Sequence, residues 1–592
     1  MIRKTWLAML AAFCMAWNAY AAEDLLRAAP KDAVVVARVR NLHALWSGLA
    51  ESDAFKRIEN APLAELRQGI ARARDDIAAF EQQTGQDVEL GLASIFGTDA
   101  ALVMFPDKTA AFVARSADPG RMAQAVEMIV TIERNEGKYM EETVGFYEGV
   151  EIQSFRIKKP VAPVETARNR SHAIADNVLI VSESPDAVRR VIDVVKAGAP
   201  SLAEATEYAT AMKHVSPDAF ATLYLDTDRL ATMEDIERFL AGELKNPAAK
   251  LLVERAKSIL AVTHYVVAEI KTRPDGLVMD YTIAYDEEAA KEAYGDLTPT
   301  EGAALDIVRL VPRDAVFFFA NQCDKTALWR RLVEATTDTM PKAAEDLRAK
   351  AEHLGRMAGN LDFETELLNQ LDDQAALIVL AGAGPDDPPG AALALEMKPG
   401  ATLPVSLKTM IGFVAGVARM EADEQGVEAM VDAERWSYLE TDVATLILKE
   451  PELEGKLNPT VFVKDKFLVI ATTPDCARAI LDAHAAQEVN PPAVEGRTTA
   501  GFARLNARAT AALIEKHRAF LLAEAVKDGK TLEKSASDLD ALRFLLSFLQ
   551  SIEMRSTYAP GLFKRAMEIS FEPPGAGRPP PGLSLPNGAA DE

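Results

Sequence analysis

The sequence predicts an α+β protein built from two tandem homologous units, each a mostly antiparallel sheet with helices packed on one face. Three observations lead to this fold class: segments that recur in the same order in both halves, tight hairpins between apolar strands, and helix-capping residues directly after those strands. Hydrophobic residues make up 49% of the 592 residues and charged residues 26%, a composition typical of folded chains. At about 150 residues per domain, this length predicts more than one core.

The recurring segments are spread over most of the chain. Residues 26–37, LRAAPKDAVVVA, resemble residues 308–319, VRLVPRDAVFFF, and an Ala-Leu-Trp triplet follows each, ending at Trp46 and Trp329. One such match can arise by chance, whereas a series in unchanged order indicates a tandem duplication. The further pairs are DAALVM at 99–104 with QAALIV at 374–379, ADNVLIVSESPD at 175–186 with KDKFLVIATTPD at 464–475, and FATLYL at 220–225 with FARLNA at 502–507.

The predicted organisation runs from a leader to a tail. It has a signal peptide at 1–21, a first α+β unit at 22–290, a linker at 291–304, a second α+β unit at 305–571 and a disordered tail at 572–592. The linker is acidic and punctuated by Pro and Gly, which disfavours regular structure. The tail holds six Pro and four Gly and almost no bulky apolar residue, so burial cannot offset the entropy of ordering it.

The first residues have the three parts of a secretory signal. A basic head at Arg3 and Lys4 precedes an apolar run at 6–17 and the small-residue site Ala19-Tyr20-Ala21. The run is shorter than the roughly 20 apolar residues that span a bilayer. We therefore expect a periplasmic or secreted protein. No later segment is expected to anchor the mature chain in a membrane, since charged residues interrupt every apolar candidate.

The charge balance narrows the choice of partners. Lys and Arg total 65 against 89 Asp and Glu, a net charge of −24. Phosphate backbones and anionic lipids repel such a surface, so nucleic acid is disfavoured and an unknown protein or small ligand, especially a cationic one, is favoured. After loss of the leader, Cys323 and Cys476 remain. An oxidising compartment permits one bridge, which the sequence leaves open. Cys476 matches Ala187 in the repeat, which indicates a small packing residue.

Local patterns predict the elements of each unit. An apolar strand is expected at 33–39, matched by 316–320, and strands at 100–105 and 110–116 should pair across a turn before a helix at Asp118-Pro119. This strand–helix–strand–strand–helix–strand order resembles ferredoxin-like folds. The first helix of that order is predicted from a stripe of apolar residues at helical spacing: Leu63, Leu66, Ile70, Ile77 and Phe80.

A hairpin and the helix after it form the clearest local motif. Asp176-Asn177 tolerates the left-handed conformations of a tight turn. Ser184 is a suitable N-cap before Pro185, and Gly198 a suitable stop. The buried stripe of this helix is predicted at Val188, Val191, Ile192 and Val195, and the second unit repeats the motif with Thr473, Ala479 and Ile480.

A search for chemistry yields no catalytic, cofactor-binding or metal-ligating residue, and no cofactor is expected. Gly-x-Ser-x-Gly and Ser-x-x-Lys signatures are missing from the sequence. Gly529-Lys530-Thr531 has Glu524 where a phosphate loop needs its first Gly, and Gly382-Ala383-Gly384 enters a turn. Asp226-Thr227-Asp228 begins like a calcium loop but lacks the later ligands. No two histidines lie within five residues of each other: His43, His172, His214, His264, His353, His484 and His517.

The Pro-Lys-Asp-Ala and Pro-Arg-Asp-Ala entries before apolar strands, together with ADNVLIVSESPD and KDKFLVIATTPD, are similar to a family of exported bacterial proteins built around a domain of unknown function. The resemblance covers both halves and implies export and α+β architecture. Its motifs are structural, so it implies no catalytic residues.

These observations favour a non-catalytic exported binding or structural protein of the bacterial envelope, with an unknown ligand. The alternatives are an exported hydrolase with a scattered carboxylate site and a carrier of apolar ligands. An enzyme would show two convergent carboxylates of shifted pKa in one copy, and a carrier a large dry cavity. Trp46 and Trp329 are expected to pack rather than to bind. Residues that differ between the copies while lining a pocket are the best functional candidates.

Overall fold

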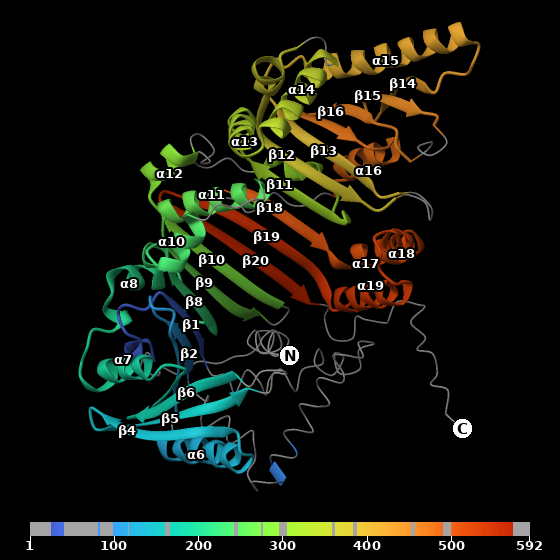
Figure 1. The fold of residues 1–592 in the computed structure, drawn as a ribbon. Coiled ribbons are helices and arrows are strands. Elements are labelled where there is room, and N and C mark those ends of the chain that lie inside the picture. Colours follow the sequence, from blue (N-terminus) through green and yellow to red (C-terminus); the bar gives the residue numbers. More distant parts are fainter. Residues whose placement is uncertain are drawn as a thin grey trace, which may run out of the picture. The chain divides into compact units, whose positions relative to one another are not determined.

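The computed structural model describes residues 25–40, 78, 81–82, 99–116, 118–159, 166–241, 247–273, 276–294, 305–357, 361–382, 388–450, 456–488 and 499–571. The chain divides into two compact units, one of Met1–Gly242 and Ile259–Tyr285, the other of Glu243–Ser258 and Asp286–Glu592 (Figure 1). The predicted signal peptide, the tail and most of the helix at 63–80 lie outside the described residues. The predicted linker begins inside helix α12 (Glu287–Tyr294), and its remainder also lies outside them.

The first unit contains one antiparallel sheet. Its strands follow the order β4-β5-β6-β7-β3-β2-β1-β8-β9-β10. The strands are β1 (Val35–Arg40), β2 (Asp99–Met104), β3 (Ala110–Arg115), β4 (Tyr139–Tyr147), β5 (Val150–Lys159), β6 (Thr166–Ala175), β7 (Val178–Ser182), β8 (Ala221–Asp226), β9 (Thr263–Arg273) and β10 (Gly276–Tyr285). The helices are η1 (Leu25–Ala28), α6 (Pro119–Asn135), α7 (Pro185–Lys196), η2 (Leu202–Glu204), α8 (Thr206–Met212), α9 (Thr227–Ala231) and α10 (Glu234–Ala241); α11 (Pro247–Val262) leads into β9.

The second unit also contains an antiparallel sheet, in the order β14-β15-β16-β17-β13-β12-β11-β18-β19-β20. The strands are β11 (Phe317–Gln322), β12 (Leu371–Leu380), β13 (Gly390–Met397), β14 (Val431–Tyr438), β15 (Thr441–Leu448), β16 (Thr460–Lys464), β17 (Phe467–Ala471), β18 (Thr499–Asn506), β19 (Leu549–Ala559) and β20 (Leu562–Phe571). The helices are η4 (Asp306–Leu310), α13 (Lys325–Thr339), α14 (Pro341–Met357), η5 (Phe363–Leu367), η6 (Leu368–Gln370), α15 (Leu403–Gln425), α16 (Pro474–Ala485), α17 (Ala507–Lys516), α18 (Arg518–Lys527) and α19 (Leu532–Leu546).

The two sheets place their strands in the same order and in the same register. Val35 lies between Met104 and Leu225 on its neighbouring strands, and Phe317 lies likewise between Val379 and Leu505. One sequence match shifts by two residues: Ala221 occupies the place of Gly501 rather than that of Ala503. A shift of two keeps every side chain on its face, because strand side chains alternate with a period of two.

The fold class is α+β with antiparallel sheets, as predicted, but two finer expectations are wrong. A ferredoxin-like sheet contains parallel neighbours joined by crossover helices, whereas β1 pairs antiparallel with both of its neighbours. Helices also cover both faces of the sheet in the second unit. Ile411 of α15 packs with Val461 and Leu468, while Ile480 of α16 packs with the alternate residues Phe462 and Val469.

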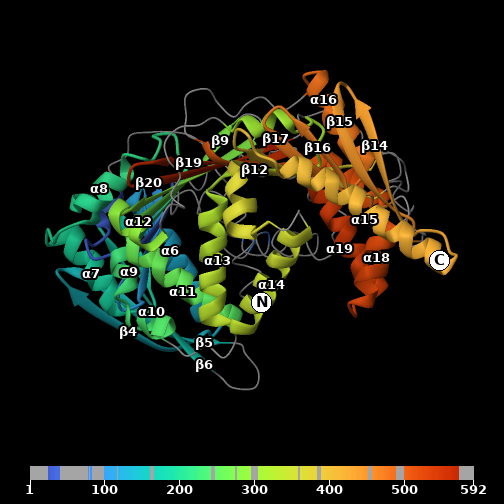
Figure 2. The ribbon, with the colours of Figure 1, turned by 90° about the horizontal axis from the view of Figure 1, so that it is seen from above.

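The reason for the second error lies in the strands. Central strands such as FLVIA at 467–471 are apolar on both sides and are buried almost throughout, so each face needs its own cover. Figures 1 and 2 show α15 lying along β14, β15 and β16. In the first unit, α6 buries Met122 and Ala125 against Leu179 of β7.

The predicted hairpin and capped helices are confirmed. Asp176 and Asp465 both have positive φ, 53° in each case, at the two-residue turns. Ser184 accepts the Ala187 N–H at 3.4 Å and Thr473 the Cys476 N–H at 3.2 Å. Gly198, with φ 69°, follows the end of α7. Two residues of the predicted stripes depart from expectation: Val195 is only half-buried and Ala479 is exposed.

The two cysteines are free thiols rather than a bridge. Cys476 is buried in the core of the second unit, and burial raises its pKa to about 12, which suits the predicted packing role. Gly390 lies against it: a Cβ on Gly390 would come within 2.8 Å of the Cys476 Cβ and 3.1 Å of its Sγ. Only a residue without a side chain fits this contact.

Gly390→Ala is therefore expected to lower the free energy of unfolding by about 1–3 kcal/mol through overpacking. Urea denaturation followed by circular dichroism measures the change. Gly120→Ala is the control, because its Cβ would meet the Asp118 Oδ1 at an ordinary 3.5 Å. Equal stability of the two variants would contradict the expectation.

Candidate binding surfaces

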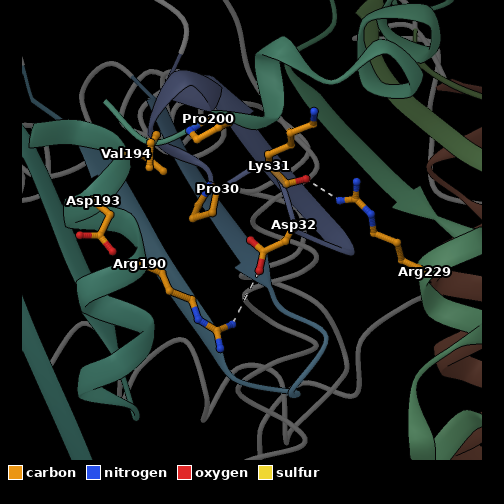
Figure 3. Close-up of a pocket in the computed structure, with 9 residues that line it drawn as sticks. Pro30, Lys31, Asp32, Arg190, Asp193, Val194, Pro200 and Arg229 are labelled. Carbon is orange, nitrogen blue, oxygen red and sulfur yellow. Dashed lines mark hydrogen bonds and ion pairs between the residues drawn. The ribbon is translucent and has the colours of Figure 1, made fainter. Parts of the chain in front are cut away.

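Two open depressions lie at matching places in the two units, where the Pro-Lys-Asp turn meets α7 and the Pro-Arg-Asp turn meets α16. Figure 3 shows the first, a volume of about 470 Å³; the second measures about 500 Å³. The first is lined by Pro30, Lys31, Asp32, Arg190, Asp193, Val194, Ala199, Pro200 and Arg229. The second is lined by Arg313, Asp314, Ala479, Asp482, Ala483, Ala486 and Glu488.

Among other differences, the first lining contains Arg190 and Arg229, and the second contains Glu488. Residues that differ between the two linings are the first candidates for a function. Arg190, six residues after the Ser184 cap, corresponds to Ala479, six after the Thr473 cap. Arg190 is already engaged, since it donates to Asp107 at 2.6 Å and its guanidinium lies 5.2 Å from the Phe105 ring centroid.

Arg229 is engaged as well. It donates to the Lys31 carbonyl at 2.5 Å and pairs with Asp226 at 3.2 Å. Arg229 therefore holds the turn of the first unit, whereas Arg190 binds Asp107 of a neighbouring hairpin and lies 4.0 Å from Asp32 of the turn. The depressions are open, unlike the enclosed apolar cavity that a carrier needs. Asp193 and Asp482, which line them, accept the hydroxyl protons of Tyr147 and Tyr438.

The calcium-like segment has a structural role. Asp226 accepts the Arg229 N–H at 2.9 Å as the N-cap of α9, and Asn506 accepts the Ala509 N–H at 3.1 Å as the N-cap of α17. Burial raises the pKa of Asp226. Within the described residues, no group of three or more His, Cys, Asp or Glu is placed to hold a metal ion.

The other segments singled out from the sequence also serve local structure. Gly529, with φ 84°, lies at the end of α18, and Thr531 caps α19 by accepting the Lys534 N–H at 3.3 Å. Trp329 is half-buried on α13, where its ring meets Phe363 edge to face at 4.8 Å. Trp46 lies outside the described residues.

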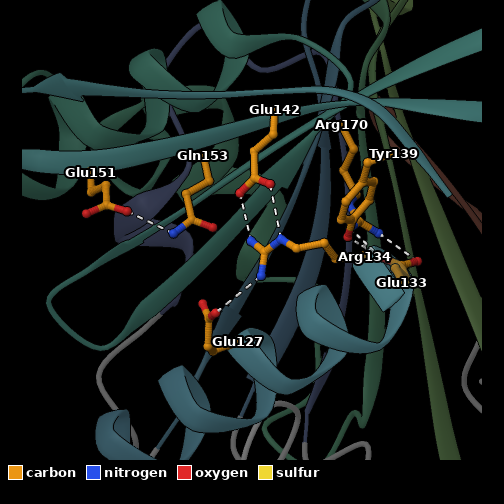
Figure 4. Close-up of polar contacts among 8 residues, drawn as sticks. All are labelled: Glu127, Glu133, Arg134, Tyr139, Glu142, Glu151, Gln153 and Arg170. Carbon is orange, nitrogen blue, oxygen red and sulfur yellow. Dashed lines mark hydrogen bonds and ion pairs between the residues drawn. The ribbon is translucent and has the colours of Figure 1, made fainter. Parts of the chain in front are cut away.

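A polar cluster between α6 and the sheet is particular to the first unit (Figure 4). Glu133 accepts from Arg170 at 2.5 Å and from the Tyr139 hydroxyl at 2.6 Å. Burial acts to raise the pKa of Glu133, but these hydrogen bonds outweigh it and lower the pKa. Burial and the bond to Glu133 raise the pKa of Tyr139. The charges satisfy one another, so the cluster fastens α6 to the sheet.

His172 completes this cluster. It is 8% exposed and stacks on Phe155 with ring centroids 5.6 Å apart. Burial, and then the charge of Arg170, lowers the pKa of His172 to about 4. By ladder position, Val461 replaces His172 in the second unit and Leu446 replaces Phe155. Comparison of the two halves of the sequence would have revealed that His172 and Phe155 are replaced in the second unit. It would not have revealed that these two side chains meet beneath α6.

The surface that the sequence analysis missed is the outer face of α15. This helix has 23 residues and a mean hydropathy of 1.3 over an 18-residue window, of which 22% is buried. By length and composition it could cross a membrane, although Lys408 and Arg419 interrupt it. The expectation that no later segment anchors the mature chain stays a prediction. Leu403, Ile411 and Ala415 face the sheet, whereas Val405 and Phe413 are 68% and 69% exposed.

Comparisons with known proteins give a match to a family model over part of the chain, but no activity. None of the curated proteins matches this chain. Among solved structures, one described as "Structure of crystal form I of TP0453" matches with a TM-score of 0.22 and 9% identity, over 48% of this chain and 90% of that one. The family model described as "Protein of unknown function (DUF3352)" matches residues 131–410, from within α6 to within α15. The predicted resemblance to a domain-of-unknown-function family is thereby confirmed, and residues 131–410 carry the match to DUF3352.

Proposed function

We propose that this chain is a non-catalytic binding protein of the bacterial envelope, exported to the periplasm or secreted, and that it binds through the outer face of α15. One observation carries the proposal: an apolar stripe exposed along a long helix. Apolar patches that face water on a folded protein mark interaction sites. The occupant we propose is an amphipathic helix of a partner protein, with basic residues beside its apolar stripe.

The stripe follows the helical period. Val405, Phe413 and Met420 lie on one side of α15 and are 68%, 69% and 62% exposed. Val427 and Met430, just beyond the helix, are 58% and 47% exposed and extend the apolar surface. Burial of such side chains contributes about 1.5–3 kcal/mol each, so a partner that covered them would gain substantial free energy.

Two glycines on the same face suit the close approach of a second helix. Gly412 and Gly416 are one turn apart. In the part of the chain that the structure describes, a Cβ on Gly416 would meet nothing within 4 Å, and one on Gly412 only the Arg435 side chain at 3.9 Å. Internal packing therefore does not require them, although Gly destabilises a helix by about 1 kcal/mol relative to Ala. Small residues at this spacing allow helices to pack closely.

Charge selects the kind of partner. Beyond the stripe, Glu421, Asp423 and Glu424 are exposed at the C-terminal end of α15, while Arg419 is paired with Asp432. The chain as a whole carries a net charge of −24. An anionic membrane surface is repelled by this end of the helix, whereas basic side chains of a partner are attracted to it.

The corresponding helix of the first unit lacks the feature. Helix α6, like α15, connects the third strand of its unit to the edge strand of the sheet. Its exposed side is mainly polar, with Gln124, Glu127, Thr131 and Arg134, and Ile129 is 38% exposed. The fold does not require an apolar outer face at this position, which supports a binding role for α15.

We also propose that the units arose by tandem duplication and that residues 1–21 direct export. The shared strand order supports duplication, as does a matched tertiary contact. Tyr147 donates its hydroxyl proton to Asp193 at 2.8 Å, and Tyr438 donates to Asp482 at 2.7 Å, at equivalent hairpins and helices. The leader composition supports export.

A synthetic helical peptide with a Leu stripe flanked by Lys tests the binding surface. Isothermal titration calorimetry with the mature chain is expected to detect binding that Phe413→Gln and Gly416→Leu each weaken at least about tenfold. Gly416→Leu is expected to keep or raise the thermal stability, since Leu is the better helix former and has open space there. Loss of binding without loss of stability therefore identifies the surface.

Ile129→Gln on α6 is the matched control and is expected to bind the peptide as the wild type does. A peptide with Glu in place of Lys should bind at least about tenfold more weakly. Equal binding by Gly416→Leu, or by the Glu peptide, would contradict the proposal. If phosphatidylcholine vesicles bound the chain and Phe413→Gln abolished that binding, the α15 surface would be assigned to a lipid membrane instead of a protein partner.

A further inference from the structure

The edge strand of the first unit carries a second surface. Strand β4 pairs with β5, from Glu141 opposite Arg156 to Tyr147 opposite Val150. Within the described residues, no strand pairs with the other edge of β4. Alternate residues of an antiparallel edge strand direct their N–H and C=O groups outward, where another strand can bind them. Three apolar side chains of β4 are also exposed: Met140 by 50%, Val144 by 54% and Phe146 by 75%.

The equivalent edge of the second unit is protected. Counting back from the matched pairs at Tyr147 and Tyr438, Arg435 occupies the place of Val144, Ser437 that of Phe146 and Trp436 that of Gly145. Trp436 donates its indole N–H to Thr445 at 3.0 Å and lies 4.8 Å from the Arg478 guanidinium. Charged residues and a covered side chain are devices that keep edge strands from pairing.

The two faces of β4 differ in chemistry. Val144 and Phe146 lie on the face that α6 covers, where Arg134 of α6 donates to Glu142 at 2.8 Å (Figure 4). The helix meets the sheet at Glu142 and leaves the two apolar side chains exposed. Glu141 lies on the opposite face and Glu148 in the turn, and both are exposed. β4 itself contains neither Lys nor Arg.

We propose that β4 binds an extended segment of another protein by strand addition, and that this segment alternates apolar and basic residues. Its backbone would complete the open edge, its apolar residues would lie beside Val144 and Phe146, and its basic residues would face Glu141. The alternation follows from the period of two in a strand, since Val144 and Phe146 lie on one face of the edge and Glu141 on the other.

A short peptide of alternating Val and Lys is the probe, added to the mature chain and followed by fluorescence anisotropy. Val144→Arg/Phe146→Ser gives β4 the residues of β14 and is expected to weaken binding at least about tenfold. Because both side chains are mostly exposed, the thermal stability should stay unchanged. The same peptide N-methylated at alternate residues cannot donate its backbone hydrogen bonds and should also bind at least about tenfold more weakly.

The control is Ser437→Ala on β14, which is expected to bind as the wild type does. Equal binding of the N-methylated peptide would exclude strand addition, and equal binding by Val144→Arg/Phe146→Ser would exclude β4. A concentration-dependent dimer in sedimentation velocity, abolished by Val144→Arg/Phe146→Ser and unaffected by the peptide, would assign the edge to a second copy of this chain and overturn the proposal.

Discussion

Replacing Asp99 by Gln is expected to lower the free energy of unfolding by about 3–5 kcal/mol. Asp99 is 1% exposed and Arg38 is 9% exposed. The guanidinium donates to both carboxylate oxygens, with Nε 2.9 Å from Oδ1 and Nη2 2.5 Å from Oδ2. Removal of the carboxylate charge takes away the counter-charge that Asp99 supplies to the buried Arg38 guanidinium, so less of the desolvation cost of that cation is compensated.

The second unit supplies the matched control. In its sheet, Ala320 and Gln374 occupy the places of Arg38 and Asp99. Gln374 accepts the Ile307 N–H at 3.0 Å, so the neutral pair is satisfied. Arg38→Ala/Asp99→Gln is therefore expected to recover most of the stability lost in Asp99→Gln, because neither residue is then a buried charge.

Urea denaturation of the wild type, both single variants and the double variant measures this coupling as a double-mutant cycle. Strict additivity, with the double variant as unstable as the sum of the singles, would show that the charges do not depend on each other for stability. The other single variant, Arg38→Ala, is also expected to lower the free energy of unfolding strongly, since it removes the cation that Asp99 binds and leaves the carboxylate buried.

His172→Val is expected to remove a pH dependence of stability. The pKa of His172 is about 4 in the folded chain, against about 6.5 for an unfolded histidine. Between these values the unfolded chain binds a proton that the folded chain does not. Stability therefore falls as the pH drops from about 6.5 to about 4, by about 3 kcal/mol in total, and this contribution is constant above and below that window.

Val is the residue found at the equivalent position, Val461, so the substitution keeps a side chain that the fold accepts. Urea denaturation at a series of pH values measures the effect. The difference in stability between wild type and variant should change by about 3 kcal/mol across the window, with the wild type losing more. The variant of an exposed histidine, His264→Val, serves as the control. If the free energy of unfolding of the wild type and of His172→Val changed with pH in the same way, His172 would not be the source of the pH dependence.

The sequence by itself determined the local elements. Asp176 at a two-residue turn, Ser184 before Pro185, and the same devices at Asp465 and Thr473 predict hairpins and helix starts because each depends on the conformation of a few consecutive residues. The recurrence of these segments also anticipated that both units would share their strand order. Tight hairpins imply antiparallel neighbours, which predicted the α+β class.

Tertiary structure decided what covers each surface. The sequence of a strand that is apolar on both sides, such as 467–471, does not reveal which helix covers which face. The expectation that helices pack on only one face of each sheet was therefore wrong. The same limit hid the outer face of α15, since hydropathy along a helix does not separate residues against the sheet from those facing water. The meeting of Arg38 with Asp99, and of His172 with Arg170, likewise depends on strand register over long sequence separations, which no local pattern encodes.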